Sequence, residues 1–471
     1  MAEPRETIVV GAGVIGAACA LQLQRDGHQV RLIDRDPPGA GTSSGNAGSI
    51  STGSVVPVAL PGMLRQVPGW LLDPQGPLSV RWAYLPKALP WLLQWIRASK
   101  TERAESYAAA LARLTLNAVE DWTSILEAEQ RERLIHQKGQ LLVSRTQEAG
   151  KTELFAQALR DANGVASETV DEDALRQLEP GLSRDFKRGL FIPDSGHTTN
   201  PQALTEALVA LLQAAGGQFT RAEVLEVDQS GGQAQAVVTA GGRFPAAKVV
   251  VATGAFSLDL ARPLGDRVPL DTERGYHAMA LKPELALNRP TSDMDRKFFA
   301  TSMEEGLRVA GTVEIAGTKA PPDYSRARRL LRQAKEMLPD LDTSEHRFWM
   351  GYRPSLPDSL PVIDRARNVQ NVWYAFGHGH LGLTMAPATA QQIVRMLRAP
   401  GGVWTTMTFA SIASDRLTQI RALQRRQERK EHEPGQGGRH HGRGQRHGGG
   451  GRSPAGRRWF PGGHSFILRE G

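Results

Sequence analysis

The chain has 471 residues, and 40% of them are hydrophobic, which is the balance of a folded globular protein with room for two or three domains. The formal net charge is +8, but residues 413–471 hold 13 Lys+Arg and 5 Asp+Glu, so the rest of the chain is neutral. That neutral body gives no reason to expect nucleic-acid binding. The single cysteine, Cys19, excludes a disulfide framework and a cysteine-rich metal site.

The N-terminal segment lacks the pattern of a signal peptide. No run of about 18 uninterrupted apolar residues occurs along the chain, so no membrane-spanning helix is predicted. We therefore expect a cytoplasmic protein.

The first 34 residues predict a complete strand–helix–strand unit. Residues 7–10 read as a short buried strand, residues 17–26 as a helix, and residues 29–33 as a second strand. A glycine-rich turn joins the first strand to the helix. This arrangement is a βαβ unit of about 30 residues, which indicates an α/β fold with a parallel sheet.

Gly11, Gly13 and Gly16 form the pattern G-x-G-x-x-G between the first strand and the helix. Such glycines permit a tight turn, a close approach of the backbone to a pyrophosphate, and close packing of helix against strand. The helix N-terminus then offers N–H groups to the phosphates. Asp34, at the end of the second strand, suits the ribose hydroxyls and disfavours a 2′-phosphate, and the neighbouring Arg35 does not change this. The sequence predicts a dinucleotide site, without choosing between NAD and FAD.

Residues 41–48 (Gly-Thr-Ser-Ser-Gly-Asn-Ala-Gly) follow this unit, and their small hydroxyl and glycine residues suit a loop pressed against a cofactor. Residues 59–100 are rich in Pro, Trp and Leu. Two readings stay open for that stretch: a membrane-surface or partner-binding face, or a set of aromatic side chains that line the second domain. Residues 101–135 predict one long amphipathic helix.

The second half of the chain repeats the pattern of strands that run into glycine turns. Strands are predicted over 223–227, 236–239 and 248–252, the last ending at Thr253 and Gly254. A further strand over 372–376 meets a Gly/His turn and then a helix over about 383–398. A helix N-terminus there suits the negative charge of a reduced flavin. No acidic or cysteine residue stands near the two histidines of that turn at ligand spacing, so no metal site is predicted.

The motifs together resemble the D-amino acid oxidase superfamily of FAD proteins, and within it the bacterial D-amino acid dehydrogenases most closely. Glycine oxidase and D-hydroxyproline dehydrogenases are also similar. The resemblance covers about residues 5–412. The motifs that carry it are residues 9–16, 42–48, 274–276 (Arg-Gly-Tyr), 351–354 (Gly-Tyr-Arg-Pro), 357–358, 361–363 and 377–382.

The resemblance implies a Rossmann-like FAD-binding domain plus an α+β substrate domain with a mixed or antiparallel sheet. The FAD-binding domain is expected to be discontinuous, made of residues 1–60, 195–260 and 345–412. The substrate domain is expected to comprise residues 61–194 and 261–344. Residues 413–471 depart from the family, and we expect their basic Gly/Arg/His-rich sequence to be disordered.

The resemblance also implies which residues form the site. Arg353 is expected at the substrate carboxylate, which a guanidinium binds as a bidentate pair. Tyr276 is open between substrate contact and core packing, and Val224 is expected to offer backbone bonds to the adenine. The expected cofactor residues are Gly11, Gly13, Val14, Ile15, Gly16, Asp34, Arg35, Thr42, Ser43, Ser44, Asn46, Ala47, Gly48, Val224, Thr253, Gly254, Gly379, His380, Leu381, Gly382, Leu383 and Thr384.

The implied reaction is hydride transfer from the Cα of a D-amino acid to flavin N5, followed by hydrolysis to a 2-oxo acid and ammonia. Oxidation of a secondary amine or of glycine is the alternative, with sarcosine or D-hydroxyproline as examples. A flavoprotein that binds RNA through its basic tail is an alternative of another class. The electron acceptor is open between oxygen, a quinone and a carrier, and a peripheral contact with the inner membrane is a hypothesis.

Overall fold

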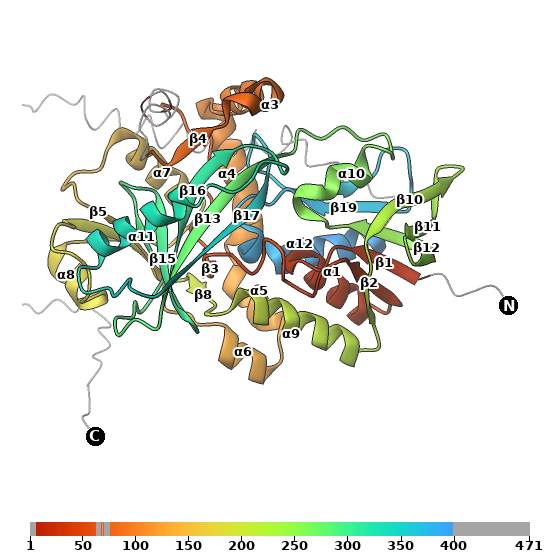
Figure 1. Ribbon diagram of the computed structural model, residues 1–471, viewed down its shortest axis with the longest axis horizontal. Coiled ribbons are helices and arrows are strands. Elements are labelled where there is room, and N and C mark those ends of the chain that lie inside the picture. Colours follow the sequence, from red (N-terminus) through yellow and green to blue (C-terminus); the bar gives the residue numbers. More distant parts are fainter. Residues whose placement is uncertain (1–5, 63–66, 68, 70–75, 399–471) are drawn as a thin grey trace, which may run out of the picture. The chain divides into compact units, whose positions relative to one another are not determined.

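The computed structural model describes residues 6–62, 67, 69 and 76–398. The expected tail, residues 413–471, and the Trp70–Leu72 part of the Trp-rich stretch lie outside the described residues. The described residues all belong to one compact unit. Its strands belong to two large sheets, which Figure 1 shows side by side, and to one small pair of strands, β3 (Ser49–Ile50) and β8 (Gly196–His197).

The first sheet has eight strands around a parallel centre. The parallel strands are β9 (Gln218–Arg221), β2 (Val30–Asp34), β1 (Glu6–Val10), β12 (Gly242–Val251) and β19 (Val372–Phe376) in spatial order. The antiparallel additions are β10 (Val224–Ser230), β11 (Gln233–Thr239) and β18 (Val362–Arg365). The strand–helix–strand unit is thus present, with β12 inserted beside β1 from far along the chain.

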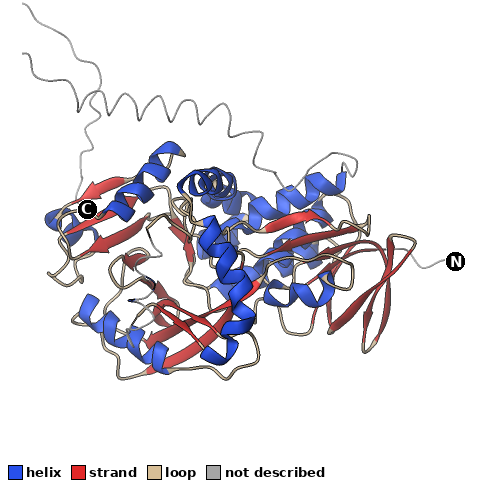
Figure 2. Ribbon diagram, turned by 90° about the horizontal axis from the view of Figure 1, so that it is seen from above, coloured by secondary structure: helices blue, strands red, loops and turns tan. Residues whose placement is uncertain are grey.

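Helices cover this sheet and bury its apolar residues. One face packs against α1 (Val14–Arg25), α9 (Pro201–Ala214) and α12 (Gly382–Arg398), which share a core with β1 and β2. Figure 2 shows helices lying against the strands of the molecule. Because α1 is made almost entirely of small and apolar residues, it packs closely against both α9 and α12.

The second sheet has nine strands and is mainly antiparallel. Its strands are β4 (Leu78–Val80), β5 (Gln140–Ser144), β6 (Glu168–Val170), β7 (Arg188–Ile192), β13 (Asp271–Leu281), β14 (Thr291–Asp293), β15 (Phe298–Met303), β16 (Gly306–Ile315) and β17 (His346–Ser355). Helix α11 (Ser325–Met337) packs on one face with the core residues Tyr276, Phe298 and Leu330. The expected α/β architecture with a second mixed sheet is confirmed.

The remaining helices are α3 (Leu85–Ala98), α4 (Thr101–Thr115), α5 (Ala118–Ile125), α6 (Ala128–Leu134), α7 (Lys151–Ala162), α8 (Glu172–Leu178) and α10 (Ser257–Ala261), with short 3₁₀ turns at Trp82–Tyr84 and Gly254–Phe256. Of these helices, α10 follows β12 of the first sheet and precedes β13 of the second, and the others lie on the chain between strands of the second sheet.

Two sequence expectations differ from this arrangement. Residues 101–135 form three helices rather than one, with breaks at residues 116–117 and 126–127. In the second of them, Trp122 donates from its indole to the Leu383 carbonyl oxygen, 2.8 Å away. The helices α5 and α6 also share the core of the first sheet, although residues 61–194 were assigned to the substrate domain. Strand β17 pairs with β13 in the second sheet, so the chain returns to the first sheet after Ser355 and not at residue 345.

Candidate functional site

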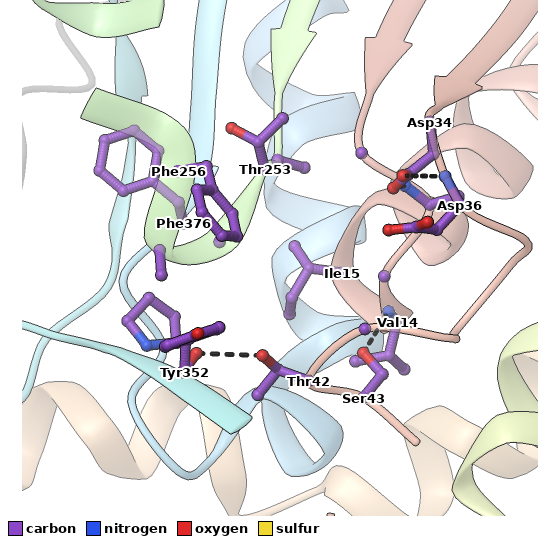
Figure 3. A pocket seen from close by; sticks show the side chains of 18 of the residues that line it. Val14, Ile15, Asp34, Asp36, Thr42, Ser43, Thr253, Phe256, Tyr352 and Phe376 are labelled. Atoms are coloured by element: carbon purple, nitrogen blue, oxygen red, sulfur yellow. Dashed lines mark hydrogen bonds between the residues drawn. The ribbon is translucent and has the colours of Figure 1, made fainter. Parts of the chain in front are cut away.

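A cavity of about 460 Å³ opens at the carboxyl ends of β1, β2, β12 and β19. Ligands of open α/β sheets bind at this edge. Figure 3 shows Asp34 and Asp36 on one side, Phe256 and Phe376 on the other, and Val14 and Ile15 of α1 between them.

Two of the three fingerprint glycines, Gly11 and Gly13, line the cavity, and Gly16 packs against Gly11 next to it. A Cβ on Gly11, whose φ is +105°, would lie 2.5 Å from the Ala252 carbonyl oxygen. A Cβ on Gly16 would lie 1.8 Å from the Gly11 carbonyl oxygen. Gly13 is the residue that precedes α1 and has an extended backbone. The chain therefore brings β1, β12 and α1 closer together than any side chain would allow, which is the cradle that a pyrophosphate needs.

The first turn of α1 points its amides into the cavity. The Val14 amide donates to Ser43 Oγ at 3.0 Å, and the Ile15 and Gly16 amides have no intrahelical acceptor because they lie in the first turn. The positive end of the helix dipole adds to their attraction for phosphate. Ser43 belongs to the loop of residues 41–48 and lines the same cavity as this first turn.

Asp34 ends β2 at the far side of the cavity. Its Oδ2 accepts from the Ala12 amide at 2.6 Å, and its Oδ1 accepts from the Asp36 amide at 3.0 Å. Those bonds fix the carboxylate while each oxygen keeps a lone pair for a ribose hydroxyl. Arg35 lies over the Phe256 ring at 4.8 Å and donates to Glu223 at 3.2 Å. This end of the cavity has the aromatic and polar groups that an adenosine requires.

The opposite end of the cavity is the turn before α12. The Gly379 amide donates to the Pro354 carbonyl oxygen at 2.8 Å, and Thr42 Oγ1 donates to the Tyr352 carbonyl oxygen at 3.1 Å. These bonds tie the turn and the loop to β17. Burial lowers the pKa of His378 to about 3, so this imidazole is neutral, and its Nε2 lies 3.0 Å from Thr389 Oγ1.

The structure brings most of the expected cofactor residues to one cavity. Those that line it are Gly11, Gly13, Val14, Ile15, Asp34, Arg35, Thr42, Ser43, Asn46, Val224, Thr253, Gly254, Gly379, Gly382 and Leu383. The other expected residues do not line it: Gly16, Ser44, Ala47, Gly48, His380, Leu381 and Thr384. Thr384, for example, accepts from the Ser51 amide at 3.2 Å and so ties α12 to the loop.

Arg353 lies on the face of β17 that adjoins the cavity region. Its Nη1 donates to the Thr312 carbonyl oxygen at 3.0 Å. Burial lowers the pKa of the guanidinium, and the charge of Glu273, its partner on β13, raises it. The side chain nevertheless keeps accessible surface. Arg353 does not itself line the cavity, but Tyr352 and Pro354 on either side of it do. A desolvated guanidinium that keeps accessible surface beside the cavity suits recognition of a carboxylate.

Tyr276 lies on the opposite face of β13 and is 0% exposed. Its hydroxyl donates to Glu314 Oε2 at 2.5 Å and accepts from the Asp323 amide at 3.0 Å. Alternation along the strand explains this position, because Tyr276 is three residues from Glu273 and so points away from Arg353. Of the two readings left open for this residue, the structure places it in the core.

Sequence reasoning missed two side chains on the face of Arg353, Glu273 and Trp349, and gave little weight to a third, His277. Trp349 stacks on His277, with ring centroids 4.9 Å apart and planes 13° apart. The signal for Trp349 was its spacing of four residues from Arg353, which places both on one face once the segment is known to be a strand. Nothing in the sequence paired Glu273 with Arg353.

Within the described ranges, no helix is long and apolar enough to cross a membrane. The same residues contain no group of three or more His, Cys, Asp and Glu side chains placed to hold a metal ion.

The fold and the cavity define a dinucleotide-binding protein of the FAD class. Residues 6–396 match the family described as FAD dependent oxidoreductase. A D-amino-acid oxidase of Bradyrhizobium diazoefficiens is 39% identical over 404 residues, which cover 84% of this chain and 96% of that protein. A D-amino acid dehydrogenase of Rhodopseudomonas palustris is 34% identical, with 84% and 94% covered. A solved glycine oxidase of Geobacillus kaustophilus superposes with a TM-score of 0.67 at 20% identity, covering 86% of this chain and 97% of that one.

The chain therefore belongs to this family of FAD dependent oxidoreductases. FAD is its cofactor, and the glycine cradle, the α1 amides and Asp34 are residues that fit it.

Proposed function

We propose that the protein oxidises D-amino acids to 2-oxo acids and ammonia. The observation that carries this proposal is Arg353, a desolvated and accessible guanidinium on the face beside the flavin end of the cavity. A guanidinium in such a position binds a carboxylate with two charge-assisted hydrogen bonds. The names of the two relatives above, a D-amino-acid oxidase and a D-amino acid dehydrogenase, support the choice of substrate.

Different residues would bind different parts of the cofactor. The amides of Ile15 and Gly16 would hold the pyrophosphate, and Asp34 the ribose. Val224, at the start of β10 in the cavity wall, would offer backbone groups to the adenine. The first turn of α12, at Gly382 and Leu383, would place the positive end of a helix dipole against the pyrimidine edge of the flavin ring.

The substrate would be oriented by Arg353, which fixes the carboxylate and so the direction of the Cα–H bond. When bound, the flavin accepts the hydride of that bond. His378, the histidine in the cavity wall, is held neutral by burial and donates to or accepts from Thr389, so it does not serve as a strong base. These residues are therefore compatible with hydride transfer from a substrate whose amine is already neutral. Such a transfer needs no general base at the Cα.

The test is a visible spectrum of the purified holoprotein under anaerobic conditions. Addition of each of a panel of D-amino acids should bleach the flavin band, and the matching L-amino acids should not. The same panel contains glycine, sarcosine and D-hydroxyproline as the rival amines. Bleaching by these compounds alone would replace the proposed substrate class. Reoxidation by oxygen, a soluble quinone or a protein carrier would then identify the electron acceptor.

We also propose that α3 touches an anionic membrane surface. The exposed large apolar side chains in this region are Trp82, Leu89, Leu93 and Ile96. Leu89, Leu93 and Ile96 share one side of the helix by their spacing, and the exposed cations Lys87 and Arg97 lie among them. Other aromatics of the stretch turn inward: Trp91 donates from its indole to the Ser355 carbonyl oxygen at 3.1 Å.

Flotation with vesicles tests this contact. Vesicles with phosphatidylserine should retain the protein, and a Leu93→Glu/Ile96→Glu variant should be lost from them. Equal retention of the variant would contradict the role of α3.

A further inference from the structure

The paired strands β13 and β17 carry a row of residues on one face. Glu273 pairs with Arg353, Gly275 with Gly351, and His277 with Trp349. Side chains of paired residues point to the same face of a sheet, and the face repeats at every second residue. The row therefore has a charged end, a floor of two glycines and an aromatic end.

The glycine floor is covered by the side chains at its two ends. A Cβ on Gly275 would lie 2.4 Å from Cζ of Arg353, and a Cβ on Gly351 would lie 2.0 Å from Cη2 of Trp349. The guanidinium and the indole thus lie flat over neighbouring residues of the two strands. Paired residues in such strands have Cα atoms roughly 5 Å apart. Little space separates the carboxylate-binding group from the ring.

Several contacts hold the indole in place. His277 stacks on it, and His277 Nδ1 lies 3.2 Å from the Gly45 carbonyl oxygen. A Cβ on Gly45 would lie 2.1 Å from the indole, so the loop also packs directly on the ring. Burial, and then the charge of Arg308, lower the pKa of His277 to about 3. The wall made by this stacked pair is therefore uncharged.

A second cavity of about 460 Å³ lies beyond the stacked pair. It is lined by His277, Met279, Met303, Arg308, Phe348 and Trp349, among others. Trp349 lines both this cavity and the cofactor cavity. The indole thus lies between the cofactor cavity and this second cavity.

We propose that Trp349, held by His277, is the distal wall of the substrate site and restricts the enzyme to amino acids with short side chains. This inference rests on the proposed function, because Arg353 must hold the substrate carboxylate. The guanidinium and the indole lie over the paired glycines Gly275 and Gly351, so a substrate whose carboxylate is held by Arg353 has the indole beside it, where a long side chain would meet the ring. Removal of the indole joins the second cavity to the site and admits bulky side chains.

The test compares kcat/KM for D-alanine and D-phenylalanine in four proteins: wild type, Trp349→Phe, Trp349→Ala and the control Gln202→Ala. Gln202 lines the second cavity from α9 and bonds to Glu206 at 2.9 Å, away from the row. Wild type should prefer D-alanine. In Trp349→Ala the ratio of kcat/KM for D-phenylalanine to that for D-alanine should rise at least tenfold. In Trp349→Phe this ratio should lie between the values of wild type and Trp349→Ala, and in Gln202→Ala it should equal the wild-type value. A wild-type preference for D-phenylalanine, or an unchanged ratio in Trp349→Ala, would overturn the proposal.

Two outcomes separate this inference from the proposed function. If no D-amino acid bleaches the wild-type flavin, the proposed function fails first. If Trp349→Ala loses FAD, the Trp349→Phe variant is titrated with acetate and with phenylacetate, and the flavin spectrum reports binding. The variant should gain affinity for phenylacetate relative to acetate, and an unchanged relative affinity would sink the idea.

Discussion

The cofactor cavity and the row on β13 and β17 are built from different parts of the chain. In the cofactor cavity the backbone makes the site: glycines that admit close approach, amides of the first turn of α1, and carbonyl groups that tie the loop to β17. In the row, side chains make the site: Arg353, Glu273, Trp349 and His277. The first region offers one geometry to one ligand. The second offers a surface whose selectivity changes with single side chains.

The largest effect is expected from a substitution that disrupts the cofactor cavity made by the backbone. Gly16→Ala places a methyl group 1.8 Å from the Gly11 carbonyl oxygen, so α1 must move away from β1 and the pyrophosphate cradle opens. We expect the purified variant to retain less than about a tenth of the wild-type flavin, since overpacking of this kind costs about 1–3 kcal/mol or more. Flavin absorbance per protein measures it. Gly150→Ala is the control, because nothing lies within 4 Å of a Cβ there. Full flavin in Gly16→Ala would contradict the cradle.

The next largest effect is expected from a substitution in the row on β13 and β17, which should leave the cofactor cavity intact. Arg353→Met removes the group that holds the carboxylate, and loss of a buried charged partner costs about 2–5 kcal/mol, so kcat/KM should fall roughly 30-fold or more. The fall should lie mainly in KM, with flavin content unchanged. Steady-state kinetics and the flavin band measure both.

Two further variants show whether this result is specific to the role of Arg353 in binding the substrate. Arg347→Met alters an exposed arginine of the same strand that pairs with Glu305, and it should change kcat/KM less than about twofold, as surface pairs contribute little. The double variant Arg353→Met/Glu273→Gln should recover stability lost by leaving the buried Glu273 carboxylate alone, but not KM. Recovery of KM in the double variant would show that Arg353 acts only as the partner of Glu273.

The comparison also explains what the sequence could and could not predict. The positions of Gly11, Gly16 and Asp34 could be predicted from the sequence. A site made by the backbone needs particular residue types at fixed spacing, and that pattern can be recognised. Arg353 was found only through a family motif, and Glu273 was not found, because the two meet by strand pairing across 80 residues of chain. The sequence also does not show that β17 pairs with β13 in the second sheet, because that pairing joins segments far apart in the chain.

A smaller effect is expected from a substitution of Tyr276, which tests whether this residue belongs to the core or to the substrate site. Tyr276→Phe removes a hydroxyl that donates to Glu314 and accepts from the Asp323 amide. Loss of bonds in a buried network should lower the free energy of unfolding by about 1–3 kcal/mol, with KM unchanged. Urea unfolding and kinetics on the same sample decide it. A rise in KM with an unchanged unfolding midpoint would return Tyr276 to the substrate site.

The smallest effect is a pH dependence of stability that both regions share. Burial lowers the pKa of His378, in the cofactor region, and of His277, in the row, to about 3, whereas an unfolded histidine titrates near about 6.5. Between these values the unfolded chain binds more protons than the folded one. Stability is therefore full above about pH 6.5 and falls as the pH decreases, by roughly 1.4 kcal/mol per pH unit for each such histidine.

Urea midpoints of the flavin-saturated protein at pH 7.5 and 5.5 measure the slope, and carboxylates contribute to it in every variant. The informative quantity is the difference from His378→Gln, which keeps a polar group beside Thr389 and removes one protonation site. That difference should amount to roughly 1.4 kcal/mol per pH unit below pH 6. An identical slope would mean that His378 reaches solvent before the chain unfolds. The turn that backs the flavin end would then open on its own, and the cofactor region would not be the rigid partner of the two.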